Sequence, residues 1–177
     1  MKFATKALLG AGALALMSGM ASAADLACLI TKNNTNPFFV KMKEGAEAEA
    51  KKLGAKLLSA AGKQDGDTAG QITAMENMVA AGAKTILITS SGDAIVPTIK
   101  KIKAQGVQVI ALDSPVPEAD ALFATNNYKA GELIGAYAKA TLGGKKPVIA
   151  TLDLFPGHPV GAQRHNGFLA GMGLKTL

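Results

Sequence analysis

The stretch TILITSSGDAIVPTIKKIKAQGVQVIALD, residues 85–113, contains a strand, a helix and a second strand. Residues 85–89 and 107–112 are short, mostly apolar runs rich in Ile, Leu and Val, which are typical of strands. Asp93 is positioned to cap the helix between them. The inward face of that helix is formed by three residues at helical spacing, Ile95, Ile99 and Ile102. The stretch therefore predicts one β–α–β unit of a parallel sheet.

The same alternation of apolar runs and helical periodicity continues on both sides of this unit. We predict further strands at residues 26–30, 55–58, 122–125 and 148–152. We predict further helices at about residues 39–53, 68–81, 130–141 and 160–172. Thr68 and Gln71 have the spacing of a capping box at the start of one of these helices. The chain is therefore expected to be an α/β protein with a doubly wound parallel sheet and right-handed crossovers.

Composition excludes several classes of protein. The chain has 177 residues, of which 49% are hydrophobic and 18% charged, which is too apolar for an intrinsically disordered chain. Its single cysteine, Cys28, rules out an intramolecular disulfide and a cysteine-based zinc site. Because Cys28 lies within an apolar run, we expect it to be a buried core residue.

The first 23 residues have the three parts of a secretory signal peptide. Lys2 and Lys6 precede an uncharged apolar run at residues 7–17, and Ala21-Ser22-Ala23 is a small-x-small cleavage site. The apolar run is shorter than the roughly 20 residues that span a membrane. We therefore predict cleavage after Ala23 and a periplasmic mature chain, which argues against a nucleic-acid partner despite the net charge of +6.

The loops after the predicted strands lack the common catalytic motifs. There is no G-x-G-x-x-G, no phosphate-binding loop and no G-x-S-x-G nucleophile elbow. His158 and His165 are seven residues apart, which does not place a metal-binding pair on one helical face. We interpret His158, beside Pro159, as an exposed loop residue, and residues 65–67 as a turn and helix cap. The sequence predicts no enzyme activity, no cofactor and no metal.

The same loops instead contain hydrogen-bonding side chains and two adjacent aromatic rings. In an open parallel sheet the ligand binds beyond the carboxyl ends of the strands. A sugar needs amides or charges for its hydroxyl groups and a ring for its C–H face. The residues that offer this combination are Asn36, Phe38, Phe39, Asp113, Asn126, Asn127 and Arg164. Phe39 could equally be core packing, Asp113 a turn cap and Arg164 a solvated helix residue.

Five short segments in the right order carry a family resemblance. They are Asn36-Pro37-Phe38-Phe39, Ala80-Ala81-Gly82-Ala83, Ile110-Ala111-Leu112-Asp113, Ala124-Thr125-Asn126-Asn127 and Arg164-x-x-Gly167-Phe168. With the export signal, they resemble the periplasmic sugar-binding proteins of bacterial ABC transporters. These are the ribose-binding-protein-like group, with the type I periplasmic binding fold. Within that group, residues 62–67 and 123–137 look most similar to the fructose-type proteins.

The resemblance implies a two-lobed protein that closes on a monosaccharide and delivers it to a membrane permease. It implies sugar contacts from Asn36, Phe38, Phe39 and Asp113 in the first lobe and from Arg164 in the second. A fructose- or ribose-like sugar is expected, and a chemoreceptor partner and a monomeric state are compatible with this. Two departures stand out: ribose binders carry Arg where this chain has Ser114, and relatives often have Asp-Asn where it has Asn126-Asn127.

The resemblance also predicts the domain organisation. Residues 1–23 are the signal peptide, 24–126 the first lobe without its C-terminal return segments, and 127–177 the start of the second lobe. We therefore expect an N-terminal fragment. Two alternatives stay open at this point: the ligand-sensing core of a LacI-type transcription regulator, which shares the fold, and a secreted α/β hydrolase.

Overall fold

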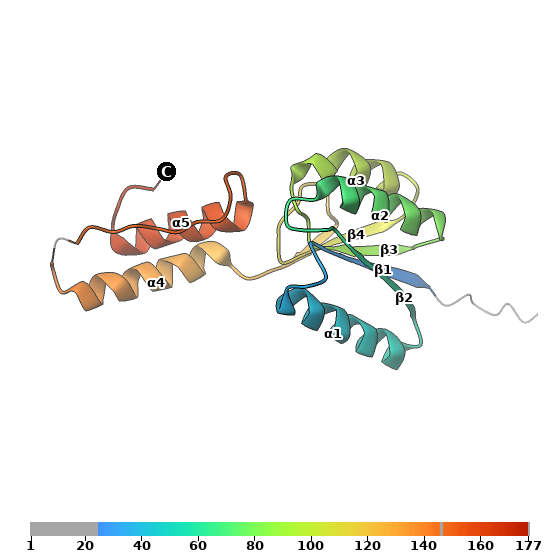
Figure 1. Cartoon of the computed structure of the whole chain (residues 1–177), viewed down its shortest axis with the longest axis horizontal. Helices are drawn as coiled ribbons and strands as arrows, with labels where there is room; N and C mark the ends of the chain where they lie inside the picture. Colours follow the sequence, from blue (N-terminus) through green and yellow to red (C-terminus); the bar gives the residue numbers. More distant parts are fainter. Residues whose placement is uncertain (1–24, 146, 177) are drawn as a thin grey trace, which may run out of the picture.

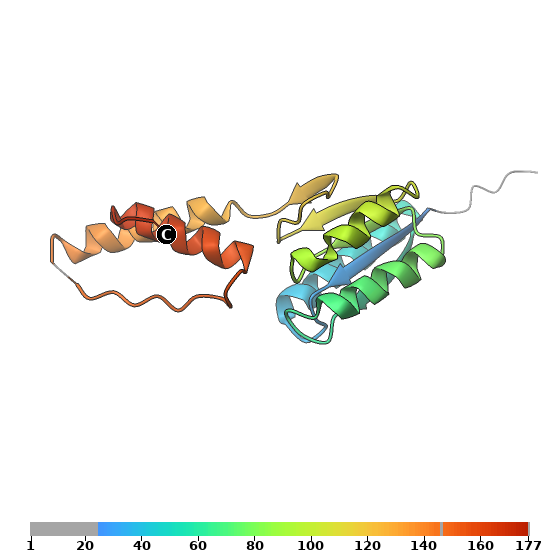
Figure 2. The same ribbon diagram turned by 90° about the horizontal axis from the view of Figure 1, so that it is seen from above.

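The computed structural model describes residues 25–145 and 147–176. They form a sheet covered by helices, which we call the sheet unit (residues 25–123), and a pair of helices beside it, which we call the helical unit (residues 127–172) (Figure 1). A single extended segment, residues 124–126, leads from one to the other. Figure 2 shows the same two units from above.

The sheet unit contains a five-stranded parallel sheet, as predicted. Its strands are β1 (Leu26–Thr31), β2 (Lys56–Ala61), β3 (Thr85–Ile88), β4 (Gln108–Leu112) and β5 (Ala121–Phe123). Their order across the sheet is β2-β1-β3-β4-β5, and every neighbouring pair is parallel. Cys28 lies in β1, an interior strand, and is paired with Leu58 on one side and Ile86 on the other. The doubly wound α/β fold is therefore confirmed.

Helices cover both faces of the sheet. Helix α1 (Pro37–Leu53) lies on one face, and α2 (Thr68–Ala80), the short 3-10 helix η1 (Asp93–Ile95) and α3 (Val96–Lys103) lie on the other (Figure 1). The core fills the space between the sheet and this second group of helices. Its most buried members include Cys28, Ile30, Met75, Ile86, Ile88, Ile95, Ile99, Ile102 and Val109. The buried Cys28 was predicted, and its burial raises the pKa of the thiol.

Two of the predicted helix caps are wrong. The N-cap of α2 is Asp67, whose side chain accepts a hydrogen bond from the Gly70 N–H, and Thr68 is already inside the helix. Aspartate is as good a cap as threonine, and here it lies one residue earlier. Asp93 lies within η1 and makes no side-chain cap. The interpretation of residues 65–67 as a turn and helix cap agrees with this arrangement.

Helix α1 is less deeply packed than its periodicity predicts. Of its apolar stripe only Phe39 is buried, whereas Leu53, at the far end, is 70% exposed. The helix contacts β1 and β2 at one edge of the sheet, so it has few neighbours besides them. An apolar stripe shows which face of a helix can be buried, but the neighbouring elements decide how much of it is.

The helical unit is held together by interlocking glycines. It consists of α4 (Asn127–Leu142) and α5 (Pro159–Met172). A Cβ atom at Gly131 would overlap the Arg164 carbonyl oxygen, and one at Gly167 would overlap the Tyr128 carbonyl oxygen. Gly135 and Gly171 repeat this relationship one turn further along. Because only glycine leaves room for such backbone contact, these positions bring the two helices unusually close.

The bulky residues of α4 lie outside this contact. Leu133, Ile134 and Tyr137, whose spacing marked the helix in the sequence, are 59%, 63% and 73% exposed. The helix was therefore predicted correctly, but its packed face is the glycine face. Apolar periodicity does not reveal a face that packs through its backbone.

The strand predicted at residues 148–152 is not present. These residues form no strand, and the side chains of Val148 and Leu152 are fully exposed. A strand exists only when another strand supplies its hydrogen bonds, and the sheet of the described residues ends at β5. The apolar run has β propensity but no partner beside it.

The predicted signal peptide and its cleavage site lie outside the described residues. Within the part of the chain that the structure describes, no helix is long and apolar enough to cross a membrane.

The glycine contact between α4 and α5 can be tested by adding single methyl groups. We expect Gly131→Ala and Gly167→Ala each to lower the free energy of unfolding by about 1–3 kcal/mol, because the helices must separate to admit the Cβ. Gly45→Ala is the matched control, since a Cβ there meets nothing within 4 Å. In the helix interior it should stabilise by up to about 1 kcal/mol. Denaturant unfolding followed by circular dichroism measures all three, and equal effects would contradict the proposed contact.

Candidate ligand-binding site

The order of the strands fixes where a ligand can bind. The chain passes from β1 to β2 on one side and then returns to β3 on the other, so the winding direction reverses between β1 and β3. In open parallel sheets the loops that follow two such strands diverge, and ligands bind outside the carboxyl edge near this point. Lys32 and Asn33 follow β1, and Ser90 and Ser91 lie in the loop after β3.

The Gln71 side chain holds the carboxyl ends of β1 and β3 together. Its side chain is fully buried, and its Nε2 donates to the backbone oxygens of Thr31 at 3.2 Å and Thr89 at 2.8 Å. Its Oε1 accepts a hydrogen bond from the Ser91 N–H at 2.9 Å. One amide thus joins the carboxyl ends of β1 and β3 and the loop beyond them. The sequence suggested a capping role for Gln71, and the structure shows this different one.

Asn36 begins α1 and has a structural role of its own. Its side-chain oxygen accepts a hydrogen bond from the Phe38 N–H at 3.0 Å, which makes it the helix N-cap. The preceding loop is fixed by Asn33, whose side-chain oxygen accepts from the backbone N–H of Asn36 at 2.8 Å. Because the loop and the helix start are held in this way, the two phenylalanines that follow have defined positions.

Phe38 and Asp113 lie on the same groove. The groove has a volume of about 430 Å³ and is lined by Phe38, Met42, Leu112, Asp113, Phe123, Ala124 and Thr125. The Phe38 ring is 52% exposed, so its face is available to a ligand. The structure therefore brings these two predicted site residues to one groove, and their contact with a sugar stays a prediction.

Asp113 has an unusual backbone conformation. Its φ is +61°, in the left-handed region that side chains other than glycine, asparagine and aspartate rarely adopt. The Asp113 N–H donates to the Phe123 carbonyl at 2.8 Å, and the Ser114 N–H donates to the Leu112 carbonyl at 2.6 Å. The sharp turn at the end of β4 is thereby fixed together with β5. Such backbone conformations often mark functional positions.

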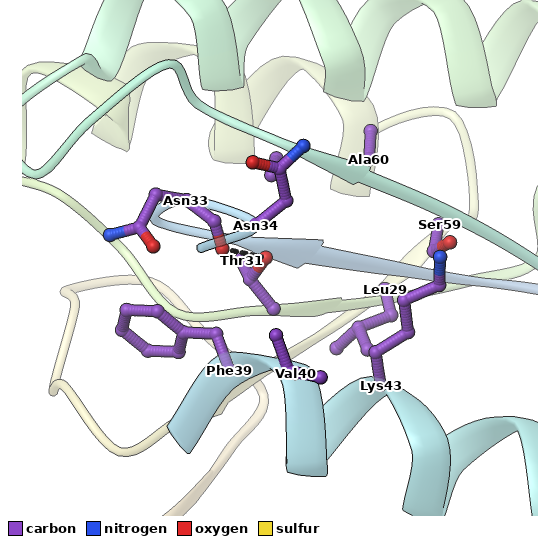
Figure 3. A pocket seen from close by; sticks show the side chains of 10 residues that line it. Leu29, Thr31, Asn33, Asn34, Phe39, Val40, Lys43, Ser59 and Ala60 are labelled. Atoms are coloured by element: carbon purple, nitrogen blue, oxygen red, sulfur yellow. Dashed lines mark hydrogen bonds between the residues drawn. The ribbon is translucent and has the colours of Figure 1, made fainter. Parts of the chain in front are cut away.

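Phe39 packs in the interior instead of lining this groove. It is 5% exposed, and its ring meets that of Phe38 edge to face with centroids 5.3 Å apart. Figure 3 shows it on a second pocket of about 250 Å³ between α1 and the first two strands. The burial of Phe39 therefore supports the interpretation that it is a core residue. A role as a ligand contact stays a prediction.

Arg164 lies in the helical unit and does not line the groove of Phe38 and Asp113. Its Nε donates to the side-chain oxygen of Asn127 at 2.8 Å, and Asn127 in turn donates to the Thr125 carbonyl at 3.1 Å. Asn126 caps α4 through the Lys129 N–H. These contacts tie α5 to the segment that joins the two units. The structure therefore brings Phe38 and Asp113 together but leaves Arg164 apart from them.

Sequence reasoning missed a buried pair that joins the two units. The Lys32 Nζ lies 2.9 Å from the His158 Nε2, and the two residues are 4% and 8% exposed. Burial lowers the pKa of Lys32, which Asp65 and Asp113 partly offset by their negative charge. His158 is therefore not the exposed loop residue that Pro159 suggested. The one sequence signal for this pair is the position of Lys32, which comes directly after the first predicted strand.

No metal centre emerges from this geometry. Within the described residues, no three histidine, cysteine, aspartate or glutamate side chains are grouped so that they could hold a metal ion. The site consists of hydrogen-bonding groups and an aromatic face, which can bind a polar organic ligand without reacting with it.

Comparison with known protein families identifies the chain. The model of the periplasmic binding protein domain matches residues 26–176, which is nearly all of the described chain. This chain belongs to that family. Its members named below are import and solute-binding proteins, so the family is one of binding proteins and not of enzymes.

Several relatives agree on the kind of protein. The chain is 32% identical over 136 residues to the ribose import binding protein of Bacillus subtilis, covering 75% of this chain and 44% of that protein. It is 33% identical over 128 residues to a D-apiose import binding protein of Paraburkholderia graminis, covering 70% and 40%. The chain spans about half the length of the curated relatives that it matches.

Solved structures show the same fold. A solute-binding protein of an ABC transporter from Mycobacterium smegmatis, with bound glycerol, has a TM-score of 0.78 and 26% identity, covering 84% of this chain and 52% of that one. The periplasmic component of a sugar transport system from Hahella chejuensis has a TM-score of 0.76 and 31% identity, covering 82% and 55%. These relatives give the transcription-regulator and hydrolase alternatives no support.

The three hydrogen bonds of Gln71 predict that one substitution of similar size will strongly lower the stability of the fold. Gln71→Leu leaves the Thr31 and Thr89 carbonyls and the Ser91 N–H buried without this partner, so the free energy of unfolding should fall by about 2 kcal/mol or more. Gln163→Leu, on the exposed surface of α5, is the control and should change it by less than about 0.5 kcal/mol. Denaturant unfolding compares the two variants. Similar stability of both would show that Gln71 does not fasten the sheet.

Proposed function

We propose that this chain captures a monosaccharide in the periplasm for delivery to the permease of an ABC transporter. The observation that carries this proposal is the groove at the carboxyl edge, where the exposed Phe38 ring and the Asp113 carboxylate lie together. Membership in the periplasmic binding protein family supports the transport role.

The chemistry of the groove suits a sugar. One face of a pyranose or furanose carries C–H groups that pack against an aromatic ring. Its hydroxyl groups donate to a carboxylate, which can accept from two neighbouring hydroxyls at once. Phe38 and Asp113 supply these two kinds of contact, and the Asn36 side chain at the start of α1 is a third candidate. The Phe39 ring meets the Phe38 ring edge to face and so helps to hold it in place, while a direct contact between Phe39 and the sugar stays a prediction.

We propose that the sheet unit belongs to the first lobe, residues 24–126, and the helical unit to the second, residues 127–177. In this arrangement Arg164 contributes from the second lobe when the two close around the sugar. The closed state would then be favoured by a ligand that contacts both lobes, which is a population shift. Arg164 donates a hydrogen bond to Asn127. When the lobes close, this bond would either break to free the guanidinium or stay in place and orient the guanidinium toward the sugar.

The substrate that we propose is a fructose- or ribose-like monosaccharide. Relatives are named for ribose, D-apiose and D-allose. Ser114 follows Asp113 where ribose binders carry arginine, so one two-pronged hydrogen-bond donor is replaced by a single hydroxyl. This difference favours a sugar whose hydroxyl pattern differs from that of ribose. Export through a signal peptide cleaved after Ala23, a monomeric state and a chemoreceptor partner stay predictions.

The ligand class can be tested by thermal unfolding of the purified chain with a panel of monosaccharides. The panel contains D-ribose, D-allose, D-apiose, D-arabinose and D-fructose at high concentration. A sugar at about 100 times its Kd adds roughly 2.7 kcal/mol to the stability of the folded state. We expect one sugar to raise the Tm by several degrees. A panel without any shift, confirmed by equilibrium dialysis, would contradict sugar capture by this chain.

The two groove residues can be tested with the sugar found in this way. Phe38→Ala should weaken binding at least about tenfold, or about 1.4 kcal/mol, because the aromatic face is lost. Asp113→Asn should weaken it about ten- to hundredfold, because a charged acceptor becomes neutral while asparagine still tolerates the left-handed backbone. Isothermal titration calorimetry measures both.

Matched controls remove an aromatic ring and a carboxylate elsewhere. Tyr137 is 73% exposed on α4, and Asp25 precedes β1 at the opposite edge of the sheet. Tyr137→Ala and Asp25→Asn should bind the sugar as the unaltered chain does. If Phe38→Ala and Asp113→Asn also bind it normally, the groove is not the sugar site.

A further inference from the structure

The contact between Lys32 and His158 joins residues 126 positions apart and links the two units of the chain. Lys32 follows β1 at the point where the winding of the sheet reverses, and His158 is the N-cap residue of α5. Both side chains are more than nine-tenths buried. Neither Lys32 nor His158 lines the groove of Phe38 and Asp113.

The roles of the two groups follow from their chemistry. A lysine ammonium can only donate a hydrogen bond, so the His158 Nε2, at 2.9 Å, must be the acceptor. The imidazole is then neutral and carries its proton on Nδ1. This Nδ1 is buried and has no hydrogen-bond partner within the part of the chain that is described. The contact therefore exists in one protonation state of His158 only.

Protonation would convert this hydrogen bond into a repulsion. An imidazolium has a proton on each nitrogen, so its Nε2–H would point at the ammonium of Lys32. Two positive charges at this distance in a poorly solvated site repel each other strongly. The negative charges of Asp65 and Asp113, in the loops after β2 and β4, act against that repulsion. The Phe155 ring packs edge to face on the imidazole, 4.9 Å between centroids.

We infer that the Lys32–His158 hydrogen bond is a clasp between the sheet unit and the helical unit, closed while the imidazole is neutral and opened when it takes up a proton. The clasp does not depend on what the chain binds. Its consequence for the sugar site, a closed state that is lost in acid, rests on the proposed function.

The sign of the pH dependence follows from the environment of His158. Burial, and next the positive charge of Lys32, lower the pKa of His158 from its ordinary value of 6.5, and the two aspartates act in the opposite direction. A depressed pKa means that the folded state favours the neutral form. The clasp is therefore fully formed above pH 6.5 and is lost as the pH falls through the lower value of the folded chain.

The clasp can be measured without any ligand by following the distance between the two units. Spin labels on Lys51→Cys in α1 and Tyr137→Cys in α4 lie on exposed positions, whereas Cys28 is fully buried and protected from the label. We expect a narrow distance distribution above pH 6.5 that broadens in acid. A distribution that is the same on both sides of the His158 titration would overturn the proposal.

Two substitutions separate the clasp from general acid effects. His158→Gln keeps an acceptor near the position of Nε2 but does not titrate, so its distribution should stay narrow in acid. Lys32→Met keeps the length of the side chain but removes the donor, so its distribution should be broad at every pH. The matched control is His165→Gln, which removes the only other histidine and should leave the pH response intact. A response that is lost in His165→Gln but kept in His158→Gln would refute the clasp.

Nuclear magnetic resonance gives a second readout that loss of folding cannot imitate. The ¹⁵N shifts of His158 should show the proton on Nδ1, and the titration midpoint should lie below 6.5. In Lys32→Met the midpoint should rise, because one of the two causes that lower it is gone. An unchanged midpoint would show that the pair does not interact. Because no sugar is present, these results stand whether or not the proposed transport role is correct.

Discussion

The three hydrogen bonds of Gln71 are the constraint on which the rest of the site depends. A parallel sheet whose winding direction reverses leaves the ends of two adjacent strands without a shared loop. In this chain the Gln71 amide fills that place, because it bonds the Thr31 and Thr89 carbonyls and the Ser91 N–H at once. The Thr89 carbonyl and the Ser91 N–H belong to buried residues and would be costly to leave unpaired, whereas the Thr31 carbonyl also accepts a hydrogen bond from the Gly62 N–H. The hydrogen bonds of Gln71 therefore fix the ends of β1 and β3, from which the loops that contain Lys32 and Ser91 begin.

The two units of the chain are packed in different ways, and both kinds of packing favour the segment between them as the place of any relative motion. The sheet unit is held by side-chain packing around strands such as β3 and β4, whereas α4 and α5 are held by backbone contact at glycines such as Gly131 and Gly167. Neither kind of packing deforms gradually. Residues 124–126 connect the units, and Asn127 with Arg164 braces the helical end of this connection. Closure around a ligand would thus be a rotation at this segment.

The sequence was sufficient for the order of the elements but not for all of their contacts. Apolar runs such as 85–89 and 107–112 form strands whose side chains alternate between buried and less buried positions, and their composition, rich in Ile, Leu and Val, is a local property. The run at 148–152 looks the same, yet a strand also needs a partner, which is not a local property. The position of Phe38 and Asp113 at one edge of the sheet could be predicted because both come after strands, whereas their contact with a sugar stays a prediction. The pairing of Lys32 and His158 could not be predicted, since it depends on how the helical unit meets the sheet unit.

A lysine buried beside a histidine costs folding free energy, and this cost argues for a role. Removing an ammonium from water is unfavourable unless other groups replace the lost hydration. Lys32 has the His158 Nε2 as a hydrogen-bond acceptor and two aspartates, Asp65 and Asp113, as nearby negative charges. These aspartates follow β2 and β4, so the charge is balanced only where the loops of several strands meet. A methionine would fill the same space without the cost, but it could not make the contact between the units depend on a proton. The buried charge thus gives the chain an interunit bond that responds to pH, which apolar packing cannot provide.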